Sequence, residues 1–129
     1  MLHFTTWTRR SRRERERGVA AVELALVVPI LMAMIIGVVE AGMAFNFRTQ
    51  LNNATMVAAR SYALDRDWNV ARANVTGLAP AASVTKSIDC SATTVGQPVT
   101  VTVTVRRPTV TGFFRANFDY RARGVAQCG

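Results

Sequence analysis

The residues with the clearest capacity for chemistry form a short run after an arginine-rich leader. Gly18 is followed by four apolar residues, starting with Val19, and then by Glu23. A carboxylate within a membrane helix costs up to about 3 kcal/mol at the bilayer centre and less near the surface. Glu23 lies one turn inside the apolar stretch, so one interpretation is that it only reaches back to the headgroups. Its spacing from Gly18 favours a functional role instead.

The chain has two cysteines, Cys90 and Cys128, and both follow the apolar stretch. An even cysteine count in an extracytoplasmic domain is typical of a disulfide. Closing a loop of roughly forty residues would stabilise such a domain by about 3–4 kcal/mol. We expect the disulfide because Cys128 would tie down a chain end that otherwise frays. The alternative, two unrelated buried thiols, stays open.

No set of side chains in the sequence predicts catalysis. The single histidine, His3, lies in the leader, and no glycine-rich phosphate loop, zinc-ligand set or haem motif occurs. The carboxylates after the apolar stretch show no catalytic spacing. They are Glu40, Asp65, Asp67, Asp89 and Asp119. We therefore expect a protein that is not an enzyme, with no catalytic residue, metal, cofactor or small-molecule substrate.

The apolar stretch itself extends from Val19 to Val39. As a helix it would measure about 31 Å, which matches a hydrocarbon core of about 30 Å. Pro29 removes one backbone donor inside the stretch and predicts a kink there. Six arginines from Arg9 to Arg17 precede it. By the positive-inside rule, this arrangement predicts a single-pass protein with a cytoplasmic N-terminus and an extracytoplasmic remainder.

The net charge of +8 and the pI of about 11.2 raise the question of nucleic-acid binding. The six leader arginines, however, have the position of a membrane-orientation signal. The other basic residues are scattered, and no nucleic-acid recognition module accompanies them. We therefore do not expect nucleic acid as a partner.

Behind the apolar stretch, the sequence predicts a small α+β domain that begins with a continuation of the helix. Apolar residues recur at three- and four-residue steps to about Ala63, with polar residues between them. Asp65 and Asp67 then predict the N-cap of a short second helix, and Gly77 and Pro80 predict its end.

After the short helix, the apolar period changes to two. Residues 83–90 alternate loosely, whereas 98–107 alternate cleanly, with valines on one face and threonines on the other. A third strand is expected over 118–127, which gives a small antiparallel sheet of about three strands laid against the long helix. Several aromatic residues are expected in its core, with a partner surface as the alternative: Phe45, Phe47, Trp68, Phe113 and Phe114. The chain thus divides into a leader (1–18), a transmembrane helix (19–39), a helical region (40–80) and a sheet region (81–129).

The run from Gly18 to Glu23 resembles the processing site of type IV prepilins. In that site a charged leader ends in glycine, and the mature chain carries glutamate at its fifth position. More widely, residues 15–63 resemble the TadE-like family of minor pseudopilins, which belong to bacterial tight-adherence (Flp) pilus systems. The other features that carry this resemblance are Pro29, Glu40 and the alanine-rich helix that follows. The family more often has phenylalanine where this chain has Leu24, and a TadF-like relationship stays open.

The resemblance implies a pilin-like ladle fold, a bacterial inner-membrane location and a role in pilus assembly. It also implies that a prepilin peptidase cuts the chain between Gly18 and Val19. The carboxylate of Glu23 would then neutralise the Val19 amine of a neighbouring subunit, since a paired buried charge costs far less than an unpaired one. The implied partners are the peptidase and other pilins or pseudopilins of a Tad/Flp system.

Two alternatives to a processed pseudopilin stay open. The chain could be an uncut, membrane-anchored scaffold, or a secreted or periplasmic binding protein whose signal peptide is cut after Ala44. The first residue of the mature chain distinguishes the three hypotheses. It would be Val19 for the pseudopilin, Met1 for the scaffold and Phe45 for the secreted protein.

Overall fold

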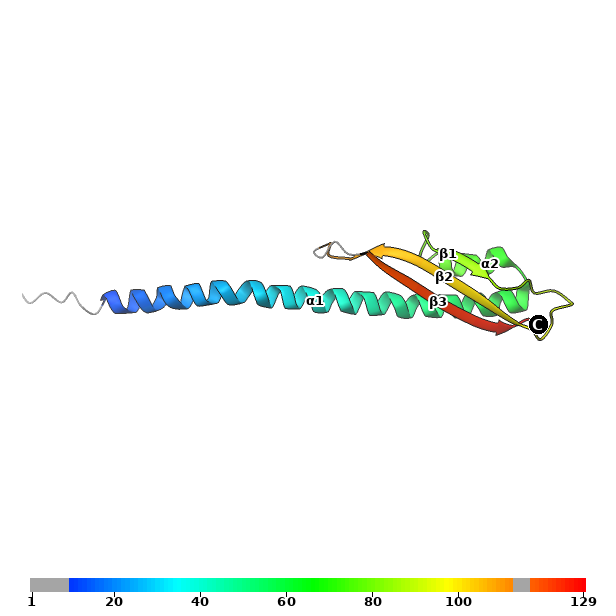
Figure 1. Ribbon diagram of the computed structural model, residues 1–129, viewed down its shortest axis with the longest axis horizontal. Coiled ribbons are helices and arrows are strands. Elements are labelled where there is room, and N and C mark those ends of the chain that lie inside the picture. The colour runs from blue at the N-terminus through cyan, green and yellow to red at the C-terminus, as the bar shows by residue number, and fades with distance from the viewer. Residues whose placement is uncertain (1–9, 113–116) are drawn as a thin grey trace, which may run out of the picture. The chain divides into compact units, whose positions relative to one another are not determined.

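The computed structural model describes residues 10–112 and 117–129 (Figure 1). Its fold is α+β, as the sequence predicts, with a long N-terminal helix, a short second helix and a three-stranded antiparallel sheet. The chain divides into two compact units, Met1–Val39 and Glu40–Gly129. The elements are α1 (Arg10–Asp65), α2 (Trp68–Thr76), β1 (Ser83–Lys86), β2 (Pro98–Pro108) and β3 (Asn117–Gln127).

The part of α1 in the first unit exposes its apolar side chains. Every residue from Gly18 to Ile35 is exposed, including Val19 at 69% and Met34 at 65%. A helix that is apolar on all sides is stable in lipid or among other helices rather than in water. The described residues thus contain one helix that is long and apolar enough to cross a membrane.

Pro29 lies inside α1, and the helix is continuous on both sides of it. Proline is tolerated within membrane helices because neighbouring groups and small local adjustments satisfy the freed carbonyl. The kink expected at Pro29 stays a prediction.

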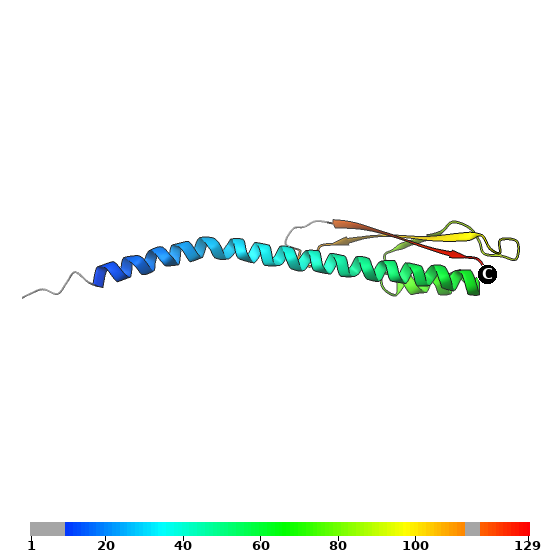
Figure 2. The same cartoon turned by 90° about the horizontal axis from the view of Figure 1, so that it is seen from below.

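From Glu40 onward, α1 buries one face against the sheet. Figure 2 shows the strands as a layer along this part of the helix. The helix ends at Asp65, two residues beyond the predicted end, because Arg66 adopts the left-handed conformation (φ 56°). The N–H of Arg66 still reaches the Tyr62 carbonyl at 3.0 Å. The buried helical residues include Leu51, Thr55, Ala58, Ala59, Tyr62 and Ala63.

The second helix, α2, begins at a side-chain cap. Asp67 Oδ1 accepts hydrogen bonds from the N–H groups of Asn69 at 2.8 Å and Val70 at 3.3 Å. Asp67 is therefore the N-cap, as predicted. The prediction was wrong for Asp65, which is the last residue of α1, because the left-handed turn separates it from α2. Gly77 ends the helix as expected.

The sheet has the strand order β1-β2-β3. The alternation in β2 is confirmed, since Val99, Val101, Val103 and Val105 are all buried. β1 ends at Lys86 and does not reach Cys90. The strand stops early because Ser87 Oγ, rather than a backbone carbonyl, accepts the N–H of Thr100 at 2.9 Å.

A glycine allows close contact between β3 and α1. A Cβ atom at Gly124 would lie 2.5 Å from the carbonyl oxygen of Thr55 and 3.1 Å from the Cα atom of Met56. No side chain fits in that space, because real Cβ contacts are longer than 3.0 Å. The buried core of α1 can therefore lie directly on the sheet.

The aromatic residues divide between core and surface. Phe47 and Trp68 pack against the buried clusters, as the core interpretation expects. Phe47 also meets Tyr120 edge-on, with ring centroids 4.9 Å apart. Phe45, in contrast, is 69% exposed. Phe113 and Phe114 lie outside the described residues.

Candidate functional site

The residues of the expected processing site, Gly18, Val19 and Glu23, all lie in the helical first unit and are exposed. No described atom outside the helix's own backbone and the chain neighbours lies within 4 Å of a Cβ built at Gly18. Packing in the described structure therefore does not require glycine at this position. Glycine inside a helix costs about 0.5–1 kcal/mol relative to alanine, and the same cost applies at Gly37 and Gly42, which are equally uncrowded.

Glu23 is the only charged residue between Val19 and Val39. Among the side chains that the structure describes, from Gly18 onward, none forms a hydrogen bond or ion pair with it. The arrangement is an apolar rod with one carboxylate near its start. Such a rod can offer that carboxylate to a cation supplied by another molecule.

A second carboxylate, Glu40, has a different setting that the sequence analysis missed. It begins the second unit, and its residue is only 7% exposed. Its oxygens accept hydrogen bonds from the backbone N–H of Val110 at 3.1 Å and of Thr111 at 2.8 Å. The Thr111 hydroxyl donates a further bond. Glu40 thus holds the segment after β2 against α1.

These donors favour the charged form of Glu40. The Thr111 hydroxyl lowers the pKa of the carboxyl most, and the backbone N–H groups of Thr111 and Val110 lower it further. Burial acts in the opposite direction but does not reverse the shift. Glu40 is therefore an ionised structural link at neutral pH. The sequence signal for Glu40 was a charged residue directly after an apolar stretch. That signal does not indicate hydrogen-bond donors 70 residues further along the chain.

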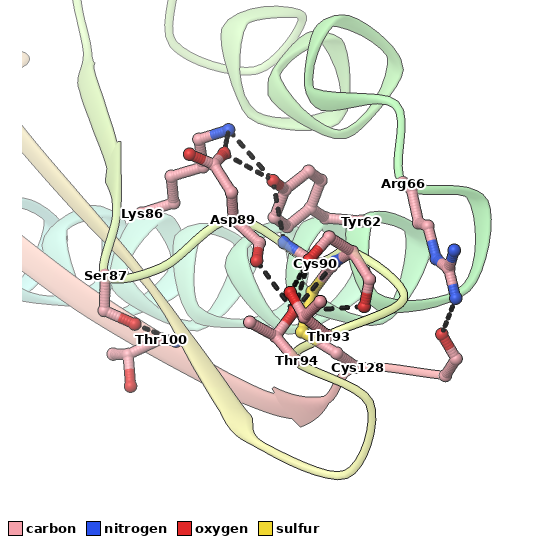
Figure 3. The surroundings of a disulfide bond; sticks show 12 residues. Tyr62, Arg66, Lys86, Ser87, Asp89, Cys90, Thr93, Thr94, Thr100 and Cys128 are labelled. Carbon is pink, nitrogen blue, oxygen red and sulfur yellow. Dashed lines mark hydrogen bonds and ion pairs between the residues drawn. A yellow bond between two sulfur atoms is a disulfide. The ribbon is translucent and has the colours of Figure 1, made fainter.

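The structure joins Cys90 and Cys128 in a disulfide, the pairing that the sequence predicts, with Cα atoms 5.4 Å apart. Figure 3 shows the bond beside the end of α1. Both cysteines are buried with Tyr62, Ala63, Ala71 and Val99. The disulfide therefore links the loop after β1 to the end of β3 next to the helix.

A polar cluster covers this disulfide (Figure 3). The Tyr62 hydroxyl donates to Asp89 at 2.9 Å and accepts from the Lys86 ammonium at 2.9 Å and from the Cys90 N–H at 3.2 Å. Lys86 also pairs directly with Asp89, and its ammonium lies 4.7 Å from the centroid of the Tyr62 ring.

These contacts shift the pKa values of both charged groups. The hydrogen bond to Asp89, and after it the hydrogen bond to the Tyr62 hydroxyl, raises the pKa of Lys86. The hydrogen bond from Lys86, and after it the hydrogen bond from the Tyr62 hydroxyl, lowers the pKa of Asp89. Tyr62, Lys86 and Asp89 thus bond to one another and to the backbone next to the disulfide, and they stabilise the fold there.

Among residues 10–112 and 117–129, no three histidine, cysteine, aspartate or glutamate side chains gather in a way that could hold a metal ion. The candidate functional groups are instead the exposed carboxylate of Glu23 in the apolar helix, and two links within the second unit. These links are the hydrogen bonds of Glu40 and the disulfide. The geometry offers contacts for assembly and for stability.

These features define a class of protein: an α+β domain with a disulfide, joined to a candidate membrane-spanning helix. The family model of TadE-like proteins matches residues 18–60. The resemblance is thereby confirmed, and over this segment the chain is TadE-like. The match contains Gly18, Glu23 and Glu40, and it ends before α2 and the sheet. It indicates a protein associated with a Tad pilus. Neither the curated proteins nor the solved structures that were compared gave a match.

Proposed function

We propose that this chain is a minor pseudopilin that takes part in assembly of a tight-adherence (Flp) pilus, and that a prepilin peptidase cuts it after Gly18. The observation that carries the proposal is the placement of Glu23, five positions after Gly18, at the start of an exposed apolar helix. The family match over residues 18–60 supports it.

The mechanism follows from the cost of a buried charge. Cutting after Gly18 gives Val19 a charged amine at the tip of the helix. When the helix leaves lipid for a bundle of apolar helices, the Glu23 carboxylate pairs with the amine of a neighbouring subunit. Removing one member of such a pair leaves an uncompensated charge, which costs about 3–5 kcal/mol. Subunits therefore join in the register that brings the two groups together.

The alternatives are less well supported by the geometry. A signal peptidase cut after Ala44 needs an unwound site, whereas the residues around Ala44 are helical and Ala44 itself is half-buried. An uncut scaffold explains the apolar helix but gives no reason for the placement of Glu23 five positions after Gly18 at its start.

Processing is tested by the N-terminus of the chain isolated from membranes with and without an active prepilin peptidase. We expect Val19 as the first residue with the peptidase and Met1 without it. Gly18→Val should block the cut, and Gly37→Val, at an equally uncrowded helical glycine, should not. A first residue of Met1 beside an active peptidase, or of Phe45 in a soluble chain, would contradict the proposal.

Assembly is tested with Glu23→Gln, which keeps the size of the side chain and removes its charge. We expect normal membrane insertion and cutting, but a loss of about ten-fold or more in incorporation into sheared pili or assembly complexes. Glu23→Asp keeps the charge and should retain part of the function. Equal incorporation of Glu23→Gln and the unchanged chain would support the scaffold alternative.

A further inference from the structure

The second unit has a surface near its start that the proposed assembly role does not use. An open groove of about 560 Å³ lies between the beginning of its helix and β3, which is an edge strand of the sheet. The aromatic and charged residues that line this groove are Phe45, Arg48, Phe118, Asp119, Tyr120 and Arg121.

The aromatic residues of the groove remain in contact with water. Phe45 is 69% exposed and Phe118 is 43% exposed, although Phe47 nearby is packed in the domain. Moving a large aromatic ring out of water lowers the free energy of the system. Exposed aromatic groups beside polar ones therefore mark contact surfaces. The two rings flank the groove from different elements, so one occupant can cover both.

The charge available in the groove is positive. Among the described residues, Arg48 and Arg121 form no ion pair. The single carboxylate of the groove, Asp119, lies 3.6 Å from Nε of Arg106 and is partly neutralised by it. The groove therefore favours an anionic occupant.

The chain connection favours lipid as that occupant. Phe45 follows Val39 by six residues, about 9 Å along a helix. Because residues 19–39 span the hydrocarbon core, this position falls at the level of the headgroups. A second copy is disfavoured, since Glu40–Gly129 has ten basic and five acidic residues and two such units repel each other.

We propose that this groove binds the anionic phospholipid headgroups of the membrane that holds residues 19–39. Arg48 and Arg121 contact the phosphates, and Phe45 and Phe118 insert between headgroups. The surface thus holds the second unit on the bilayer until the subunit is recruited. The proposal rests on membrane insertion of the helix, and it holds whether or not the chain is cut after Gly18.

The test uses the full, isotopically labelled chain in nanodiscs of phosphatidylcholine, with or without phosphatidylglycerol. A lipid with a gadolinium-chelating headgroup broadens the NMR signals of nearby amides. We expect broadening at Phe118 and Arg121, stronger with phosphatidylglycerol, and little at Leu64 and Val125, which line a different groove. Arg48→Gln with Arg121→Gln should weaken the bound state by about five-fold for each arginine.

The matched control is Arg60→Gln with Arg123→Gln, which removes two exposed arginines from the same two elements. This pair should leave the broadening unchanged. Equal broadening of all four reporter amides, equal broadening in both lipids, or equal loss in both double variants would overturn the proposal. If the Phe118 and Arg121 amides are protected from broadening only when a nanodisc holds two chains, the groove would be assigned to a second copy instead. Failure to insert is measured separately by nanodisc incorporation.

Discussion

The carboxylate of Glu40 links two segments that are 70 and 71 residues apart in the chain. Its hydrogen-bond donors among the described residues are two backbone N–H groups and one hydroxyl, none of them charged. Hydrogen bonds to an ionised acceptor are stronger than those between neutral groups. We therefore expect Glu40 to fix the position of the segment after β2 rather than to take part in chemistry.

Glu40→Gln should lower the free energy of unfolding of the second unit. It should also make that free energy less sensitive to a fall in pH. The pKa of Glu40 in the folded chain lies below its ordinary value of 4.5. Its stabilising effect is therefore complete above 4.5 and is lost as the pH falls through the lower, folded pKa. Urea unfolding between neutral and acid pH should show a shallower loss of stability for Glu40→Gln.

Asp119→Asn is the matched control for this pH series. It removes an exposed carboxyl that has only a 3.6 Å contact with Arg106, and such surface pairs contribute little. If Glu40→Gln and Asp119→Asn give the same stability profile, the link assigned to Glu40 is wrong.

Tyr62→Phe tests the polar cluster over the disulfide. The substitution keeps the ring but removes the hydroxyl that accepts the buried N–H of Cys90. An unsatisfied buried donor costs about 1–3 kcal/mol, so the thermal midpoint should fall by several degrees. Tyr120→Phe is the control, since its hydroxyl has no hydrogen bond among the described residues, and it should change the midpoint little. Differential scanning calorimetry of both variants checks this.

At the scale of elements, the contact between α1 and β3 depends on the absence of a side chain at Gly124. Gly124→Ala would place a methyl group 2.5 Å from the Thr55 carbonyl oxygen, so the strand or the helix must shift. We expect a loss of about 1–3 kcal/mol in the free energy of unfolding. Denaturant unfolding, followed by the fluorescence of Trp68 in a chain that carries Trp7→Phe, measures it.

Gly42→Ala provides the opposite case on α1 itself. No atom lies within 4 Å of its added Cβ, and alanine is the better helix former by up to about 1 kcal/mol. It should be neutral or stabilising. A destabilised Gly42→Ala, or a fully stable Gly124→Ala, would mean that the close contact is not what Gly124 provides.

The elements that the sequence predicted best are those with local signals. The valines of β2 alternate within one strand, and the side chain of Asp67 caps a helix that begins at the next residue. The contacts of Glu40 and Gly124 depend on residues far away in the chain, and no local pattern contains them. The loose alternation of residues 83–90 did not reveal where β1 ends, because the N–H of Thr100 bonds to the side chain of Ser87 instead of its carbonyl. The roles of Gly18 and Glu23 were inferred from their spacing together with the basic leader and the start of the apolar stretch, and these roles stay predictions.

At the scale of the whole molecule, the two units depend on different sources of stability. The first unit has exposed apolar side chains and needs an apolar environment. The second has a small buried core supplemented by the disulfide between Cys90 and Cys128. We therefore expect the two units to respond separately to reduction.

Replacing both cysteines by serine should destabilise the second unit by about 3–4 kcal/mol, because the closed loop of 38 residues no longer restricts the unfolded chain. In lipid vesicles, the helical circular dichroism signal from residues 19–39 should persist after the second unit has unfolded. Loss of all helical signal in one step would show instead that the units unfold together.

The link made by Glu40 also sets an order of events in time. The chain is synthesised from its N-terminus, so Glu40 is made 70 residues before Val110 can donate to it. At ordinary rates of synthesis this interval is on the order of 10 s. During that interval the carboxylate lacks the donors that hold it in the folded unit, although the apolar stretch before it has already been synthesised. The candidate membrane-spanning segment is therefore made well before the domain behind it can close.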